Sequence, residues 1–163
     1  MKSFRQNLIV STFFMLIFST TQLIQSQNGY VADESLSMKA FQEQVLKTKG
    51  EIWVVDFWAS WCRPCIDAIP EMKEIYSKYQ GKPVRIISVS WDKDSKAWRA
   101  MLQKAQMPWQ QILIPDIRNV PFLDKHFSHK AIPAVFVITQ DGKIKKATDL
   151  IKLDKMLAKL LGG

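Results

Sequence analysis

The chain has 163 residues with 47% apolar and 11% aromatic side chains, and its formal net charge is +8. This length and composition fit one globular domain with an ordinary core and exclude a disordered chain. The lysines are scattered without a run of five or more basic residues, so we expect a solvated basic surface and no nucleic-acid partner.

The first 26 residues have the layout of a secretory signal peptide. Lys2 and Arg5 give a positive start, and the apolar run Leu8–Phe18 is too short for a membrane-spanning helix, which needs about 20 residues. We expect cleavage between Thr21 and Ser26, which leaves 21 basic and 15 acidic residues and a net charge of +6. An uncleaved leader that anchors the protein in the membrane is the alternative.

The first predicted elements of the exported part are a helix and a buried strand. Met38, Phe41 and Val45 recur at helical spacing within residues 33–48, and Gly50 follows as a stop signal. Ile52–Trp58 is a continuous apolar run broken by one acid, which is typical of a strand buried on both faces.

Alternating helices and strands follow. The apolar spacing predicts a helix with one internal proline, a second buried strand, another helix, a short strand and two helical turns, at Arg63–Tyr79, Val84–Ser90, Asp94–Ala105, Ile112–Ile114 and Phe122–Phe127. The Asp-Gly pair after residues 134–139 predicts a hairpin with residues 143–147, and a last apolar stripe runs from Leu153 to Leu160. The pattern predicts an α/β domain with a central mixed sheet flanked by helices.

Cys62 and Cys65 are the only two cysteines, and they lie where the first buried strand ends and a helix begins. Unpaired backbone N–H groups and a partial positive charge at a helix start lower the pKa of Cys62 and favour its thiolate. Arg63 adds a cation that acts in the same direction, and Pro64 stiffens the first turn. We expect Cys65 to be more buried and to keep its proton until it reacts.

Three uses of such a pair compete with redox exchange. A zinc site could recruit His126 and His129, but their spacing is two residues, and they lie about sixty residues beyond Cys65, where zinc motifs have about twelve. Covalent haem would need histidine where Ile66 stands. A structural disulfide closing so small a loop would stabilise little. Redox exchange is therefore the favoured use.

Two stretches carry a resemblance to a known family. VVDFWASWCRPCIDAIP resembles the active-site segment of the thioredoxin superfamily, and AIPAVFVITQDGKI resembles its cis-proline and hairpin signature. Within the thioredoxin superfamily, the chain is most similar to the exported TlpA/ResA-like thiol-disulfide oxidoreductases. The stretch VSWDKDSKAW also resembles this branch. The 43 residues from Ser90 to Pro133 leave room for the helix and strand that this branch inserts before the cis-proline. The resemblance implies a thioredoxin-like domain over residues 30–163.

The resemblance assigns roles to single residues. Cys62 matches the attacking cysteine and Cys65 the resolving one. Pro133 matches the cis-proline beside the pair, and the backbone of Ile132 pairs with an extended substrate. Pro70 matches the proline that kinks the active-site helix. The residues around the sulfurs that would face the substrate are Trp61, Arg63 and Pro64.

Asp56 matches the buried aspartate that takes the proton from the resolving cysteine in thioredoxins. An acid within IWVVDFW is costly to bury charged, so we expect a raised pKa suited to a general base. A solvent-facing carboxylate at the strand end is the alternative. The chain departs from the branch at Ala68, where some members have glutamate, and VRIISVS has no counterpart of the thioredoxin lysine.

The resemblance implies a disulfide reductase of exported proteins that needs no cofactor and no metal. Its partners would be disulfide-bearing protein substrates and an upstream membrane thiol donor, with transient membrane association left open. The location would be periplasmic or secreted, or membrane-anchored if the leader stays. A disulfide oxidase or isomerase of the same fold, or a binding module with idle thiols, are the alternatives.

Overall fold

The computed structural model describes residues 32–33, 38–46, 50–114, 117, 120–127 and 130–162. The leader expected at residues 1–26 and the domain start expected at residue 30 lie outside these ranges. The elements, in chain order, are β1 (Ala32–Asp33), α2 (Met38–Leu46), β2 (Ile52–Trp58), α3 (Arg63–Asp67), α4 (Ile69–Lys78), β3 (Val84–Ser90), α5 (Ser95–Ala105), β4 (Gln110–Leu113), α6 (Pro121–His126), β5 (Ala134–Ile138), β6 (Ile144–Ala147) and α7 (Leu150–Leu160). None of the helices in the described ranges has the length and apolar character that a membrane crossing requires.

One mixed six-stranded sheet organises the molecule, in the order β1-β4-β3-β2-β5-β6. Neighbouring strands from β1 to β2 are parallel, whereas β5 is antiparallel to β2 and β6 is antiparallel to β5. β2 is therefore a central strand, with Asp56 opposite Ser88 of β3 on one side and Val135 of β5 on the other. β6 forms one edge, where Lys145 and Lys146 are exposed.

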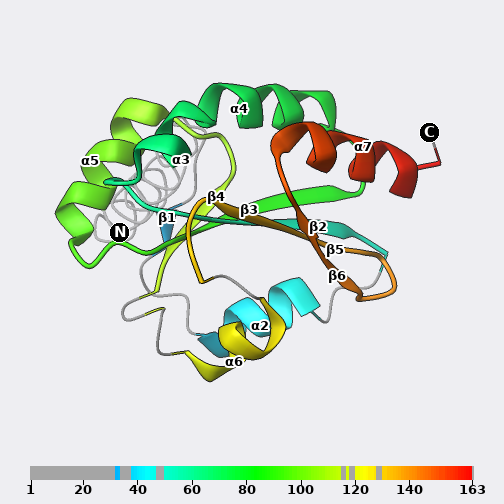
Figure 1. Cartoon of the computed structure of the whole chain (residues 1–163), viewed down its shortest axis with the longest axis horizontal. Helices are drawn as coiled ribbons and strands as arrows, with labels where there is room; N and C mark the ends of the chain where they lie inside the picture. Colours follow the sequence, from blue (N-terminus) through cyan, green and yellow to red (C-terminus); the bar gives the residue numbers. More distant parts are fainter. Residues whose placement is uncertain are drawn as a thin grey trace, which may run out of the picture.

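Helices cover the two faces of the sheet, with α3, α4, α5 and α7 on one and α2 and α6 on the other (Figure 1). Successive side chains of a strand point to opposite faces, so the apolar run of β2 supplies both cores. Ile52, Val54 and Trp58 pack under the first group of helices. Trp53, Val55 and Phe57 pack against the second group, where the Phe57 ring meets those of Phe127 and Phe136 edge-on.

The predicted mixed sheet with flanking helices is confirmed. The expected helix–strand insertion before Pro133 is present as α5 and β4. Asp94 begins α5 as its N-cap, with its carboxylate accepting a hydrogen bond of 2.8 Å from the backbone N–H of Lys96. Ser90 and Leu113 lie side by side at the ends of β3 and β4, so the insertion returns the chain next to the strand that it left.

Three predicted boundaries are wrong. The helix expected within residues 33–48 is present as α2, but it does not include Asp33, which belongs to β1 and pairs with β4. The helix expected from Arg63 to about Tyr79 is divided into α3 and α4 at Ala68. Pro70 stands in the first turn of α4, and its lack of an N–H removes one helical hydrogen bond at this division. The strand expected at Ile112–Ile114 begins earlier, at Gln110.

Candidate active site

Cys62 and Cys65 form a disulfide at the start of α3, with their Cα atoms 5.3 Å apart. Cys62 is the N-cap residue, with an extended backbone, and its carbonyl accepts the first helical hydrogen bond from the N–H of Ile66 at 3.1 Å. The first-turn N–H groups of a helix lack helical acceptors, so an anion on Cys62 would be stabilised there after reduction. The predicted position of the pair between a buried strand and a helix is confirmed.

The two cysteines are equally buried in this oxidised form, with exposed fractions of 6% for Cys62 and 5% for Cys65. The expectation that Cys65 is the more buried thiol concerns the dithiol form and stays a prediction. In the disulfide form both cysteines belong to the same buried core. Trp61, immediately before Cys62, is 64% exposed and is the large apolar side chain that the site presents to solvent.

Arg63 and Pro64 lie exposed between the two cysteines. The Arg63 guanidinium pairs with the Asp67 carboxylate one turn further along, at 2.9 Å, and both side chains are mostly in water. This pairing offsets part of the positive charge that the sequence suggested for the neighbourhood of Cys62. The start of the helix is then the main local source of thiolate stabilisation.

The peptide bond between Ile132 and Pro133 is cis, as expected from the resemblance. Pro133 precedes β5, whose first residue Ala134 lies opposite Phe57 near the end of β2. Pro133 and Cys65 line the same pocket, whereas Ile132 is half-buried and contacts the cores on both faces of the sheet. The structure therefore brings together the two stretches that carry the sequence resemblance.

Asp56 lines this pocket too, and its surroundings favour the protonated acid. Burial raises its pKa from the ordinary value of 3.8 to about 6, although a hydrogen bond from the Ser88 hydroxyl opposes the shift. The Ser88 Oγ donates to Asp56 Oδ2 at 2.8 Å, and the Trp109 indole N–H donates to Ser88 Oγ at 2.8 Å. A solvent-facing carboxylate at the strand end does not describe Asp56, which lies within β2 and beneath the helices.

The shared pocket has a volume of about 280 Å³ and lies between the sheet and the helices α4 and α7. Its lining includes Asp56 from β2, Cys65 and Ala68 around the end of α3, Trp109 before β4, and Pro133. Ala68 stands where some TlpA/ResA-like members have glutamate. The acids that line the pocket are Asp56, which is half-buried, and the exposed Glu71 and Asp149. A pocket of this size is large enough to hold water molecules beside Asp56 and Cys65, which both line it.

The described residues do not form the cluster of ligands that the zinc alternative requires. His126 belongs to α6, which lies across the sheet from α3 and its cysteines (Figure 1). The centroid of its ring is 4.7 Å from that of the Phe122 ring. His129 lies outside the described residues. Over the ranges that the structure describes, no three His, Cys, Asp or Glu side chains gather closely enough to hold a metal ion.

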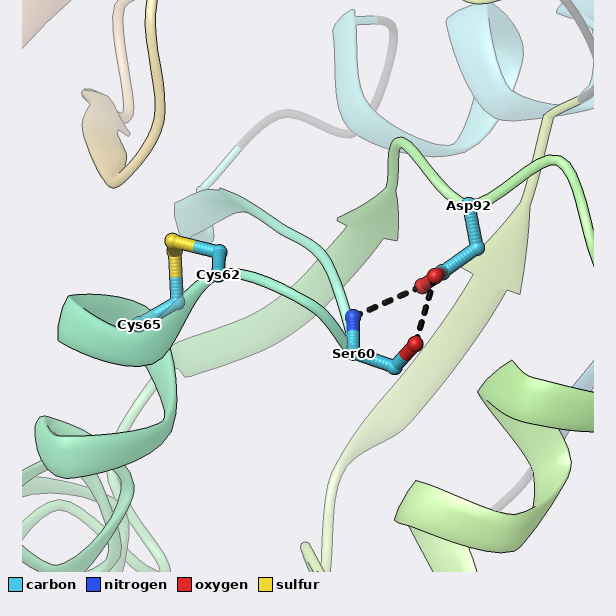
Figure 2. Close-up of a disulfide and its surroundings, with 4 residues drawn as sticks. All are labelled: Ser60, Cys62, Cys65 and Asp92. Atoms are coloured by element: carbon cyan, nitrogen blue, oxygen red, sulfur yellow. Dashed lines mark hydrogen bonds between the residues drawn. A yellow bond between two sulfur atoms is a disulfide. The ribbon is translucent and has the colours of Figure 1, made fainter.

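Asp92, just beyond β3, contacts the cysteine-bearing loop and was missed from the sequence. Its side chain is buried, and it accepts hydrogen bonds from the backbone N–H and the hydroxyl of Ser60, at 2.9 and 2.6 Å. Figure 2 shows Ser60 between this carboxylate and the disulfide. The sequence feature that could have indicated Asp92 is an acid two residues after the end of a buried strand, within VSWDKDSKAW. No local sequence feature indicated its partner Ser60.

Comparisons with known proteins agree with this geometry. A thioredoxin-like family model matches residues 50–144, which include both cysteines, Asp56 and Pro133. The thiol-disulfide oxidoreductase ResA of Bacillus cereus is 28% identical over 120 residues, which cover 74% of this chain and 65% of that protein. The chain thus spans slightly less than two thirds of the length of this curated relative.

Solved structures give the same picture. The solution structure of a candidate thiol-disulfide oxidoreductase from Bacteroides vulgatus is 34% identical with a TM-score of 0.61, covering 72% of this chain and 78% of that one. A thiol-disulfide oxidoreductase from Bacteroides fragilis is 25% identical with a TM-score of 0.62, covering 69% of this chain and 83% of that one. Each of these similarities covers about 70% of this chain.

Proposed function

Because the chain belongs to the thioredoxin-like family, we propose that it is a thiol-disulfide oxidoreductase that reduces disulfide bonds in exported proteins. The observation that carries this proposal is the bonded pair Cys62 and Cys65 at the start of α3, with the cis-proline Pro133 and the acid Asp56 on one shared pocket. A pair that only stabilised the fold would have no need of a proton acceptor beside it.

The proposed reaction begins with the reduced pair. The Cys62 thiolate attacks one sulfur of a substrate disulfide, so a bond from Cys62 to that sulfur replaces the substrate bond, and the other substrate sulfur leaves as a thiolate that takes up a proton. Cys65 then loses its proton and attacks Cys62. The second substrate thiol is released, the bond between Cys62 and Cys65 forms, and two electrons have passed to the substrate.

Asp56 is the proposed base for the second step. Its pKa of about 6 means that near pH 7 the carboxylate is formed, yet it remains basic enough to accept a proton from the Cys65 thiol, directly or through water in the pocket. Asp56 and Cys65 line one pocket from neighbouring elements, which supports this assignment.

The substrate is proposed to lie over the exposed side of the disulfide. Trp61, Arg63 and Pro64 are exposed around the sulfurs, and they supply an aromatic face, a cation and a rigid turn. On the other side, the backbone of Ile132 before the cis-proline is proposed to pair with an extended substrate segment. Such pairing recognises backbone rather than sequence, which suits an enzyme acting on many proteins.

The signal-like pattern of residues 1–26 supports a proposed exported location, periplasmic or secreted, with residues 30–163 as the proposed working domain. An enzyme that donates electrons outside the cytoplasm must be re-reduced, so a membrane thiol donor is part of the proposal. The N-terminal mass of the exported protein distinguishes a cleaved leader from a membrane anchor.

Insulin reduction by the dithiol form tests the activity, with Cys62→Ser as the matched control. We expect turnover in the wild type and none in Cys62→Ser. Cys65→Ser should instead accumulate a mixed disulfide through Cys62, visible as a mass increase that reductant removes. Equal turnover in the wild type and Cys62→Ser would overturn the activity and favour a binding module.

The reduction potential tests the direction of electron flow. A reductant should equilibrate with glutathione buffers well below about −150 mV, whereas a higher value would indicate an oxidase or isomerase. This measurement uses the full exported domain, and it separates the direction from the activity itself.

A further inference from the structure

Asp92 takes no direct part in the proposed exchange, yet its carboxylate is one of the most heavily bonded side chains near the disulfide. It is 3% exposed, and three donors converge on its two oxygens. Two of them come from Ser60, at 2.9 Å from the backbone N–H and 2.6 Å from the hydroxyl, and the third is the Ser90 hydroxyl at 2.7 Å. Hydrogen bonds to a charged acceptor are stronger than neutral ones, so this contact is firm.

The contact joins two loops that are far apart in sequence. Ser60 lies two residues before Cys62, and Asp92 lies 32 residues beyond Ser60, after β3. The Trp91 N–H also donates to the Trp58 carbonyl at 2.8 Å, and the Cys62 N–H donates to the Ala59 carbonyl at 3.1 Å. The segment that carries Cys62 is thus held at its start by Trp91, at its middle by Asp92, and at its end by its own turn.

None of these hydrogen bonds involves a sulfur atom, so reduction of the disulfide does not remove them. We call the hydrogen-bonded contact between Asp92 and Ser60 the clamp. When the bond between Cys62 and Cys65 is broken, α3 on one side and the clamp on the other still constrain the position of Cys62 (Figure 2). A free loop would let the two sulfurs move apart, which lowers their effective concentration and favours the dithiol.

We propose that Asp92 is a positioning residue of the Cys62 and Cys65 couple, which holds the Ser60 loop so that the two sulfurs stay near bonding distance after reduction. The clamp therefore favours the disulfide and makes the dithiol a stronger reductant. This inference rests on the proposed exchange activity and adds to it a residue that sets the potential without touching the substrate.

Glutathione equilibration tests the proposal. Oxidised glutathione accepts two electrons from the dithiol, giving the Cys62 to Cys65 bond and two molecules of reduced glutathione, and alkylation followed by mass measurement counts the reduced fraction. The variants are Asp92→Asn, which removes the charge and weakens the clamp, and Ser60→Ala, which removes only the hydroxyl bond. Asp94→Asn is the matched control, because Asp94 is an exposed acid of the same loop and asparagine also caps a helix well.

We expect the equilibrium constant for disulfide formation to fall by about three- to tenfold in Asp92→Asn and by a smaller factor in Ser60→Ala, where tenfold corresponds to about 30 mV. Asp94→Asn should stay within about twofold of the wild type. The double variant should differ from Asp92→Asn alone by less than the Ser60→Ala effect, because the two side chains act through one contact.

Several results would overturn the inference. One is an unchanged constant in both variants with lower thermal stability, which would make Asp92 purely structural. Another is a change in Asp92→Asn but none in Ser60→Ala, which would assign the effect to charge alone. If Asp92→Asn does not fold, Ser60→Ala decides. A wild-type protein that fails to equilibrate with glutathione would instead reject the exchange activity, which distinguishes the two failures.

Discussion

Asp56 shows how burial sets the acidity of one side chain. Its carboxyl lies under helices within a central strand, and its pKa rises from 3.8 to about 6 because a charge there loses contact with bulk water. Well below pH 4 the carboxyl is neutral in the folded and unfolded chains and costs nothing. Between about pH 4 and pH 6 the unfolded chain releases the proton more readily than the folded protein does, so the stability contributed by the neutral form is lost as the pH rises through this range.

Asp56→Asn should therefore gain stability relative to the wild type between pH 4 and pH 8. One pKa unit corresponds to about 1.4 kcal/mol, so the rise of the Asp56 pKa from 3.8 to about 6 predicts a gain of about 3 kcal/mol at pH 8 and only a small part of it at pH 4. Urea unfolding of the oxidised proteins at the two pH values measures this. A difference that stays the same from pH 4 to pH 8 would contradict the assigned pKa.

Asp56→Asn should also slow the release of substrate from its mixed disulfide with Cys62, because the variant lacks the proposed base for the Cys65 thiol.

Single residues of the site differ in how far the sequence predicted them. Cys62, Cys65 and Pro133 stand in short continuous motifs, and the structure places them as expected. Asp92 was missed because its partner Ser60 lies 32 residues away and meets it only when β2 and β3 pair side by side. The nearly equal burial of the two cysteines in the disulfide form was also not predicted.

α7 shows how one helix attaches to the sheet. Its buried side chains Leu150, Leu153 and Leu157 recur every three or four residues and pack into the core beneath α4, while Ile151 on the opposite side is 64% exposed. The Asp149 carboxylate caps the start of the helix through the Lys152 N–H at 2.6 Å. The Lys78 ammonium and the Tyr79 hydroxyl meet the Asp154 carboxylate, which joins α7 to the end of α4.

Leu157→Ala and Ile151→Ala form a matched pair on this helix. Leu157 is fully buried, so its truncation should lower the free energy of unfolding by about 2 to 5 kcal/mol through lost contacts and a residual cavity. Ile151→Ala should change it by no more than about 0.5 kcal/mol. Chemical unfolding of the two variants measures the difference. Similar losses in both would mean that Ile151 is covered in solution.

Strands with continuous apolar runs were predicted to their ends, whereas strands whose bounds depend on a pairing partner were not. The strands Ile52–Trp58 and Val84–Ser90 have the predicted bounds, because continuous apolar runs bury a strand on both faces. β1 could not be predicted from two residues, since it exists only through pairing with β4. The start of β4 at Gln110 is likewise set by its partner Ile87 in β3 rather than by its own apolar residues.

We expect the whole domain to fold without its disulfide. Two separate apolar cores cover the sheet on its two faces, and the bond between Cys62 and Cys65 closes a loop with a sequence separation of only 3 residues. Closing so short a loop removes little freedom from the unfolded chain, so the fold is available to the oxidised and reduced proteins alike. An enzyme that cycles between the two forms requires this.

Reduction should leave the protein folded, with a free energy of unfolding within about 2 kcal/mol of the oxidised form. Urea unfolding with and without a thiol reductant measures the change. The double variant Cys62→Ser and Cys65→Ser serves as the control, since reductant should have no effect on it. Loss of the cooperative transition on reduction would show that the bond is structural.

The exposed lysines of β6 have a consequence for the behaviour of many copies at once. An edge strand offers unpaired N–H and C=O groups to any neighbouring chain, and flat apolar edges start aggregation. Here Lys145 and Lys146 stand in succession on that edge, on opposite faces of the strand, so a second copy added there would meet like charges on both sides. The edge that closes the sheet thus discourages its growth into a fibre.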